Sequence, residues 1–130
     1  MGDYAFSQCF NLTAIYARGN PPAGDASLVF FGIPNWTIYY LPSTSGWGPP
    51  AVLWNPTILT TNTSFGIKTN RFGFTLTGTA DIPIVVEATT NVAGGPWTSL
   101  LNGTLTNGSI YFSDSQWTNY PRRSYRIRSP

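Results

Sequence analysis

Residues 71–91 read RFGFTLTGTADIPIVVEATTN, and this stretch decides the fold. Apolar side chains at positions 72, 74 and 76 alternate with small or polar ones, which is the spacing of a β-strand with one apolar face. Positions 84, 86 and 88 repeat the pattern after a short break, with Glu87 on the opposite face. The stretch therefore predicts two successive strands that bury one side each.

Short strand-like segments separated by turn residues extend in both directions from this pair. We expect further strands over 12–17, 28–31, 36–41, 51–54, 96–101 and 124–128. Asn107-Gly108 is a strong hairpin signal. It predicts that the strand ending near Leu105 pairs with the strand that begins near Ile110. Long helices are excluded, because Pro and Gly recur too often. The predicted fold is all-β, an antiparallel β-sandwich or barrel.

A polar connector, TILTTNTS at residues 57–64, separates two halves of different character. The residue before a proline is pushed out of the helical region, so Asn55-Pro56 closes the first half. We expect a first unit over 1–56 and a β-sandwich module over 57–130.

The chain contains few charged residues. Charged residues make up 9% of the chain, where about 25% is usual. The formal net charge of +2 gives no support for nucleic-acid binding, and no apolar run approaches the ~20 residues of a membrane helix. A surface of hydroxyls and amides suits an extracellular all-β domain.

The chain contains no histidine and one cysteine. A Ser-His-Asp triad and a histidine-activated thiol are therefore excluded, as is an internal disulfide. Cys9 lies in an apolar frame, and we expect it to be a small buried core residue. We expect no metal site and no cofactor, since zinc and copper need histidines or several thiols.

Two acidic residues leave an enzyme open as an alternative. Glu87 and Asp114 would be neighbours if their strands paired, and two facing carboxylates are what a glycosidase uses. This alternative is a small hydrolase that acts on glycans or esters through carboxylates and tyrosines. The structural interpretation is that Glu87 pairs across strands with an arginine of the terminal strand, while Asp114 forms a turn.

Four of the seven basic residues lie in PRRSYRIRSP at the end of the chain. If 124–128 is a strand, Arg126 and Arg128 share its outer face. They form a solvated face or, alternatively, a contact for a polyanion.

Aromatic residues make up 15% of the chain and are the stronger indication of a binding site. Sugar rings stack their C–H faces on indole and phenol rings. Trp47 lies between glycines in SGWGPP, and Trp117 and Tyr120 lie in the loop-like DSQWTNYP. These three are the candidate ligand-binding residues, with packing against a core as the alternative for both tryptophans.

The first 20 residues resemble the last unit of a BspA-like leucine-rich repeat of bacterial surface antigens. The repeat pattern runs I-G-x-x-A-F-x-x-C-x-x-L-x-x-I, and it is matched by Gly2, Ala5, Phe6, Cys9, Leu12 and Ile15. A single repeat cannot bury its own apolar face. We therefore expect the apolar residues of this unit to pack against the β-sandwich or against a second copy of the chain, and the chain to form a homo-oligomer.

The remainder resembles the C-terminal β-module that follows such repeats in large secreted bacterial proteins. The resemblance rests on TIYYLPSTSGWG at 37–48, on 71–91 and on the last 26 residues, beginning LTNGSIYFSDSQW. It implies a fragment of a secreted or cell-surface protein. The expected function is non-enzymatic: an extracellular attachment or assembly module that contacts a glycan or a surface protein.

Overall fold

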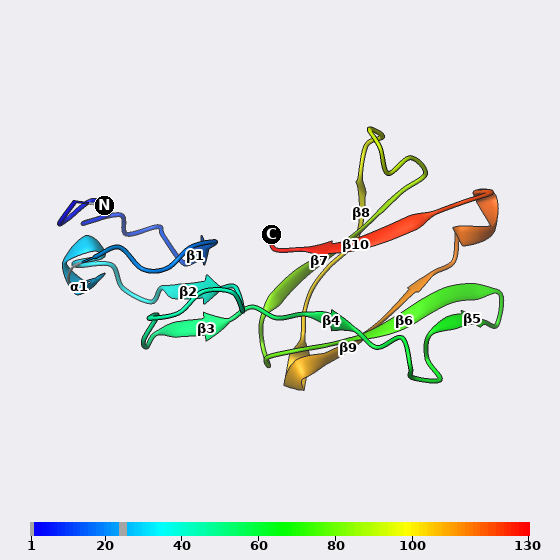
Figure 1. The fold of residues 1–130 in the computed structure, drawn as a ribbon, viewed down its shortest axis with the longest axis horizontal. Helices are drawn as coiled ribbons and strands as arrows, with labels where there is room; N and C mark the ends of the chain where they lie inside the picture. The colour runs from blue at the N-terminus through cyan, green and yellow to red at the C-terminus, as the bar shows by residue number, and fades with distance from the viewer. Residues whose placement is uncertain (1, 24–25) are drawn as a thin grey trace. The chain divides into compact units, whose positions relative to one another are not determined.

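The chain folds into two compact units, one over Met1–Asn55 and one over Pro56–Pro130. The computed structural model, drawn in Figure 1, describes residues 2–23 and 26–130. The division falls one residue before the boundary expected from the polar connector. Each unit has a sheet architecture of its own.

The first unit is built on a parallel sheet. Strands β1 (Ala14–Ala17), β2 (Thr37–Tyr40) and β3 (Ala51–Leu53) lie in that order, all parallel. Ile15 pairs with Ile38, so consecutive strands β1 and β2 are offset by 23 residues. One face of the sheet packs on a core whose buried members are Val29, Phe30, Ile33 and Ile38.

The segment that contains β1 contacts the segment that contains β2 along its length, before the strands and within them. The rings of Phe6 and Phe30 stack at 5.6 Å between centroids, and those of Tyr16 and Tyr39 at 5.2 Å. The backbone N–H of Phe6 donates to the carbonyl of Val29 at 3.0 Å. The first unit thus contains two segments of similar course that lie one on the other.

The strand expected over 28–31 is wrong. The structure has a short helix there, α1 (Ala26–Val29), followed by a turn. Val29 and Phe30 are adjacent in sequence and both buried, at 3% and 4% exposure. A strand with one buried face would direct neighbouring side chains to opposite sides, whereas a turn directs both into the core.

The expected burial of Cys9 is also wrong, because its side chain is exposed. Residues 4–12 form a series of tight turns at the edge of the first unit, where β1 pairs with β2 alone among the described strands. Tyr4 and Phe10 are exposed in the same segment, at 54% and 63%. The apolar frame exists, but the described residues do not cover it.

The second unit consists of two antiparallel sheets, and the predicted all-β class is confirmed. Its strands are β4 (Thr57–Ile58), β5 (Gly66–Lys68), β6 (Arg71–Thr77), β7 (Pro83–Thr89), β8 (Thr98–Thr104), β9 (Ser109–Asp114) and β10 (Ser124–Arg128). One sheet has the order β10-β7-β8. In the other, β6 pairs with β9 on one edge and with the short β4 and β5 on the other (Figure 1).

The core of this unit draws on both sheets and on the connections between them. Its largest fully buried side chains are Phe74, Leu76, Ile82, Ile84, Val85, Val86 and Leu105. The strands predicted from 71–91 are β6 and β7. The expectation that each buries one side is wrong for β7, where all of Ile84 to Thr89 is buried and Arg126 and Arg128 of β10 contact Glu87 on the second face.

The hairpin expected at Asn107-Gly108 is wrong in its pairing. Both residues have the positive φ of such a turn, 55° and 77°, within the 3₁₀ turn η1 (Thr106–Gly108). The strands on either side go to different sheets, β8 to β7 and β9 to β6. Leu105 is fully buried, and its N–H and C=O bond the connection before β7 at Ile82 and Asp81. Burial of this leucine fixes the chain at the point where it changes sheets.

Candidate functional site

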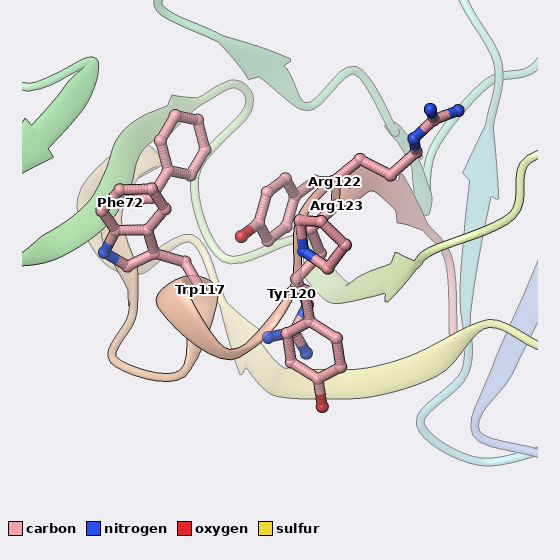
Figure 2. Close-up of a pocket in the computed structure, with 7 residues that line it drawn as sticks. Phe72, Trp117, Tyr120, Arg122 and Arg123 are labelled. Carbon is pink, nitrogen blue, oxygen red and sulfur yellow. The ribbon is translucent and has the colours of Figure 1, made fainter.

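An open pocket of about 250 Å³ lies in the second unit and is lined mostly by rings. Its walls are Phe72, Trp117, Tyr120, Pro121, Arg122, Arg123 and Tyr125 (Figure 2). Phe72 comes from β6 and Tyr125 from β10, while Trp117 begins the 3₁₀ turn η2 (Trp117–Asn119). Two of the three aromatic residues expected to bind a ligand, Trp117 and Tyr120, thus lie in one pocket.

The orientation of Trp117 is fixed by the turn opposite. Its indole Nε1 donates to the backbone carbonyl of Asn70 at 3.1 Å. Asn70 lies in the tight β5–β6 turn, where Thr69 and Asn70 both have positive φ, 48° and 58°. The hydrogen bond satisfies the polar edge of the indole, which leaves the ring face for packing or for a ligand.

Tyr120 stands at the rim, with 40% of its surface exposed. The guanidinium carbon of Arg123 lies 4.2 Å from the centre of its ring, a cation–π contact. Arg123 is itself held by an ion pair from Nη1 to Asp114 Oδ2 at 2.7 Å, and both side chains are largely buried. The rim is therefore positioned before any ligand arrives.

The buried Asp114 carboxylate holds several groups around the pocket in place. Its Oδ1 accepts the N–H of Gln116 at 2.8 Å, and its Oδ2 accepts the hydroxyl of Tyr125 at 2.8 Å. The Gln116 bond is the turn-forming contact expected of this aspartate. Burial, and then the hydrogen bond to Asp114, raise the pKa of Tyr125 well above its usual range. The hydroxyl consequently stays protonated and acts as a fixed donor.

Stacked rings form the base of the pocket. Tyr125 stacks on Phe72, with 5.1 Å between centroids and 20° between planes, and makes edge contacts with Phe74 and Phe112. These contacts join the two sheets, so the base belongs to the core. Sequence reasoning assigned Phe72 to the interior and missed its part in the pocket. The run NYPRRSYR, with two tyrosines, a proline and three arginines in eight residues, was the available signal.

Trp47, the third aromatic candidate, lies in the first unit and is half-buried. Its side chain packs against the core formed by Val29, Phe30, Ile33 and Ile38. Its Nε1 donates to the carbonyl of Gly19 at 3.0 Å. This is the packing alternative that the sequence left open for Trp47.

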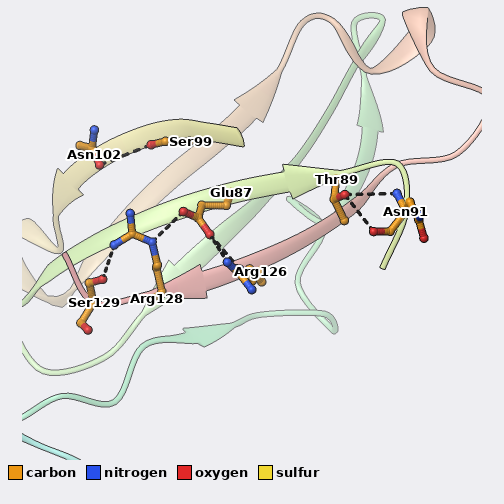
Figure 3. A network of polar contacts seen from close by, with 8 residues as sticks. All are labelled: Glu87, Thr89, Asn91, Ser99, Asn102, Arg126, Arg128 and Ser129. Carbon is orange, nitrogen blue, oxygen red and sulfur yellow. Dashed lines mark hydrogen bonds and ion pairs between the residues drawn. The ribbon is translucent and has the colours of Figure 1, made fainter. Parts of the chain in front are cut away.

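Glu87 is an ion-pair partner of the terminal strand, as the structural interpretation expected (Figure 3). Its Oε2 lies 2.8 Å from Nε of Arg126, and its Oε1 lies 2.6 Å from Nε of Arg128. Arg126 also stacks on the ring of Trp97 at 4.1 Å. The two arginines, chiefly through the hydrogen bond from Arg128, lower the pKa of Glu87.

The two carboxylates considered for acid–base catalysis are not brought together. Glu87 is on β7 and Asp114 is on β9, which pairs with β6 instead. On β10, Arg126 contacts Glu87 while its neighbour Tyr125 contacts Asp114, and neighbouring strand residues face opposite sides. The carboxylates therefore lie on opposite faces of the β7–β10 pair, and each is engaged by arginine.

No protein-family model, curated protein or solved structure matches this chain. In residues 2–23 and 26–130, no helix is long and apolar enough to cross a membrane. In the same described ranges, no three His, Cys, Asp or Glu side chains gather where they could hold a metal ion.

Proposed function

We propose that this chain is a non-enzymatic extracellular module for attachment or assembly that binds carbohydrate in the Trp117–Tyr120 pocket. The observation that carries the proposal is the pocket itself: rings from three separate segments converge there, and hydrogen bonds or cation–π contacts orient the two rim rings. Rigid aromatic walls favour stacking on the C–H face of a sugar, because little conformational entropy is lost on binding.

The setting at a secreted or cell surface, and the kinship with repeat proteins, are part of the proposal. The parallel sheet of the first unit and its 23-residue offset suit a leucine-rich repeat, whose period is about 20–29 residues. The stacked pairs Phe6–Phe30 and Tyr16–Tyr39 suit neighbouring units of a solenoid. The low share of charged residues in the chain, 9%, is in keeping with an extracellular location.

A glycan array tests the binding proposal. The parent chain is expected to retain at least one class of glycan, and Trp117→Ala is expected to weaken retention by roughly tenfold or more, the size of one lost ring stack. Tyr111→Ala is the control, because Tyr111 is an exposed ring, at 49%, that lies on β9 beside the buried Phe112 and so on the other face of its sheet from the core.

Two results would contradict the proposal. One is a parent chain that retains no glycan at all. The other is a Trp117→Ala variant that folds normally by circular dichroism and binds as the parent does.

A further inference from the structure

The arginines near the end of the chain differ in how their charges are used. Arg123 pairs with Asp114, and Arg126 and Arg128 pair with Glu87. Arg122 is exposed, lines the pocket, and makes no ion pair or hydrogen bond with any residue that the structure describes. The pocket therefore offers one positive charge that the described part of the protein does not neutralise.

The size of the pocket limits what enters it. A volume of about 250 Å³ lies just below the roughly 300–1,000 Å³ of sites that take drug-sized ligands. It accommodates one ring-sized group. The acceptor and donor groups along its walls are few, since the indole of Trp117 and the hydroxyl of Tyr125 are already engaged.

The free charge lies beside the ring site and outside it. Figure 2 shows the side chain of Arg122 extending away from the rings of Trp117 and Tyr120. A ring that stacks on Trp117 or Tyr120 therefore leaves the guanidinium group of Arg122 to contact the next group along the ligand.

We infer that the pocket selects an acidic polysaccharide: one sugar ring occupies it, and a carboxylate on a neighbouring sugar pairs with Arg122. This inference rests on the proposed function and adds the class of glycan. Arginine suits the role, because its planar fork binds a carboxylate through two parallel hydrogen bonds. The sequence suggested Arg126 and Arg128 as a contact for a polyanion, but both are paired with Glu87. Arg122 is the residue that we assign to this contact instead.

Isothermal titration with three probes tests this inference. The probes are tri-galacturonate, its methyl ester, in which the rings remain and the charges are removed, and monomeric galacturonate. Tri-galacturonate is expected to bind most tightly, with an advantage over the ester that shrinks as salt is added. Monomeric galacturonate is expected to bind no more tightly than the ester, since its one carboxylate belongs to the ring inside the pocket and does not reach Arg122.

Substitution of Arg122 isolates the charge. Arg122→Gln is expected to bind tri-galacturonate about two- to fivefold more weakly, the size of one exposed ion pair, and to bind the ester as the parent does. Arg18→Gln removes the same charge from an exposed position in the other unit and is expected to change neither.

The outcomes separate this inference from the proposed function. Equal binding of acid and ester, with both abolished by Trp117→Ala, overturns the acidic preference and leaves carbohydrate binding in place. An Arg122→Gln variant with parental affinity for tri-galacturonate also overturns the inference, as does retention of neutral glycans alone on the array. Failure of every glycan to bind overturns both.

Discussion

Gly73 leaves room for the ring of Tyr111 on the outer face of β6. A Cβ atom at position 73 would meet that ring and would lie 2.7 Å from the carbonyl oxygen of Phe112, closer than such atoms approach. Gly103 in β8 is different, because its Cβ would have Ile110 as nearest neighbour, at 3.4 Å. The glycine in the RFGF motif is thus required by its cross-strand neighbour.

Gly73→Ala is expected to lower the free energy of unfolding by about 1–3 kcal/mol, because a backbone oxygen cannot move aside as a flexible side chain can. Urea denaturation followed by tryptophan fluorescence measures the change. Gly103→Ala is the control, expected within about 0.5 kcal/mol of the parent. Equal stability of the two variants would show that Tyr111 and β9 yield easily at this site.

At the scale of single elements, the sequence predicted where strands lie better than what they pair with. The alternation in 71–91 located β6 and β7, although only β6 buries one face and exposes part of the other, while β7 is buried on both. The Asn107-Gly108 turn has the backbone geometry predicted for it, but the buried Leu105 directs β8 and β9 to different sheets. Pairing depends on such long-range packing, which a local motif does not contain.

The candidate site could also be predicted only in part, because some of its residues are brought together by long-range packing. Trp117 and Tyr120 could be predicted from their loop. Phe72 and Tyr125 could not be predicted. An aromatic residue at an inward-facing strand position has the same sequence pattern whether or not its ring also borders a pocket. Trp47 had the same local signals as Trp117, but it packs on the core of the first unit, which forms only when the parallel strands assemble.

The β7–β10 pair couples stability to acid through Glu87. Its folded pKa lies below the ordinary value of 4.5, so the unfolded state binds its proton more readily. The stabilisation is fully present above about pH 4.5 and is lost as the pH falls through the lowered pKa. Glu87→Gln is expected to be less stable at neutral pH and to lose less of its stability on acidification than the parent.

Urea midpoints measured from neutral pH down to below pH 4 test this expectation. Asp3→Asn removes a carboxylate from an exposed position and serves as the control. Parallel stability curves for the parent and Glu87→Gln would mean that the arginine pairs on β10 do not stabilise the fold.

At the scale of the whole molecule, the described part of the first unit exposes a group of four large aromatic rings. Tyr4, Phe6, Phe10 and Phe31 are 37–63% exposed, and Tyr4 and Phe31 contact each other edge to face. Solitary exposed rings are ordinary, but a group of them marks a surface for association. The expectation of a homo-oligomer rests on this group.

Light scattering at micromolar concentration is expected to give a mass above the 14.2 kDa of one chain. Phe10→Ser combined with Tyr4→Ser is expected to shift the mass toward the monomer. Tyr111→Ser, a comparably exposed ring in the second unit, is the control and should leave the mass unchanged. A monomeric parent would contradict the expectation.

The most direct test of the central claim, that the Trp117–Tyr120 pocket is where this protein binds carbohydrate, is a nuclear magnetic resonance titration of the indole N–H signals. The signal of Trp117, assigned by its loss in Trp117→Phe, is predicted to shift saturably as a retained glycan is added, while that of Trp47 stays in place. A glycan that binds without moving the Trp117 signal, or that moves the Trp47 signal instead, would contradict the claim.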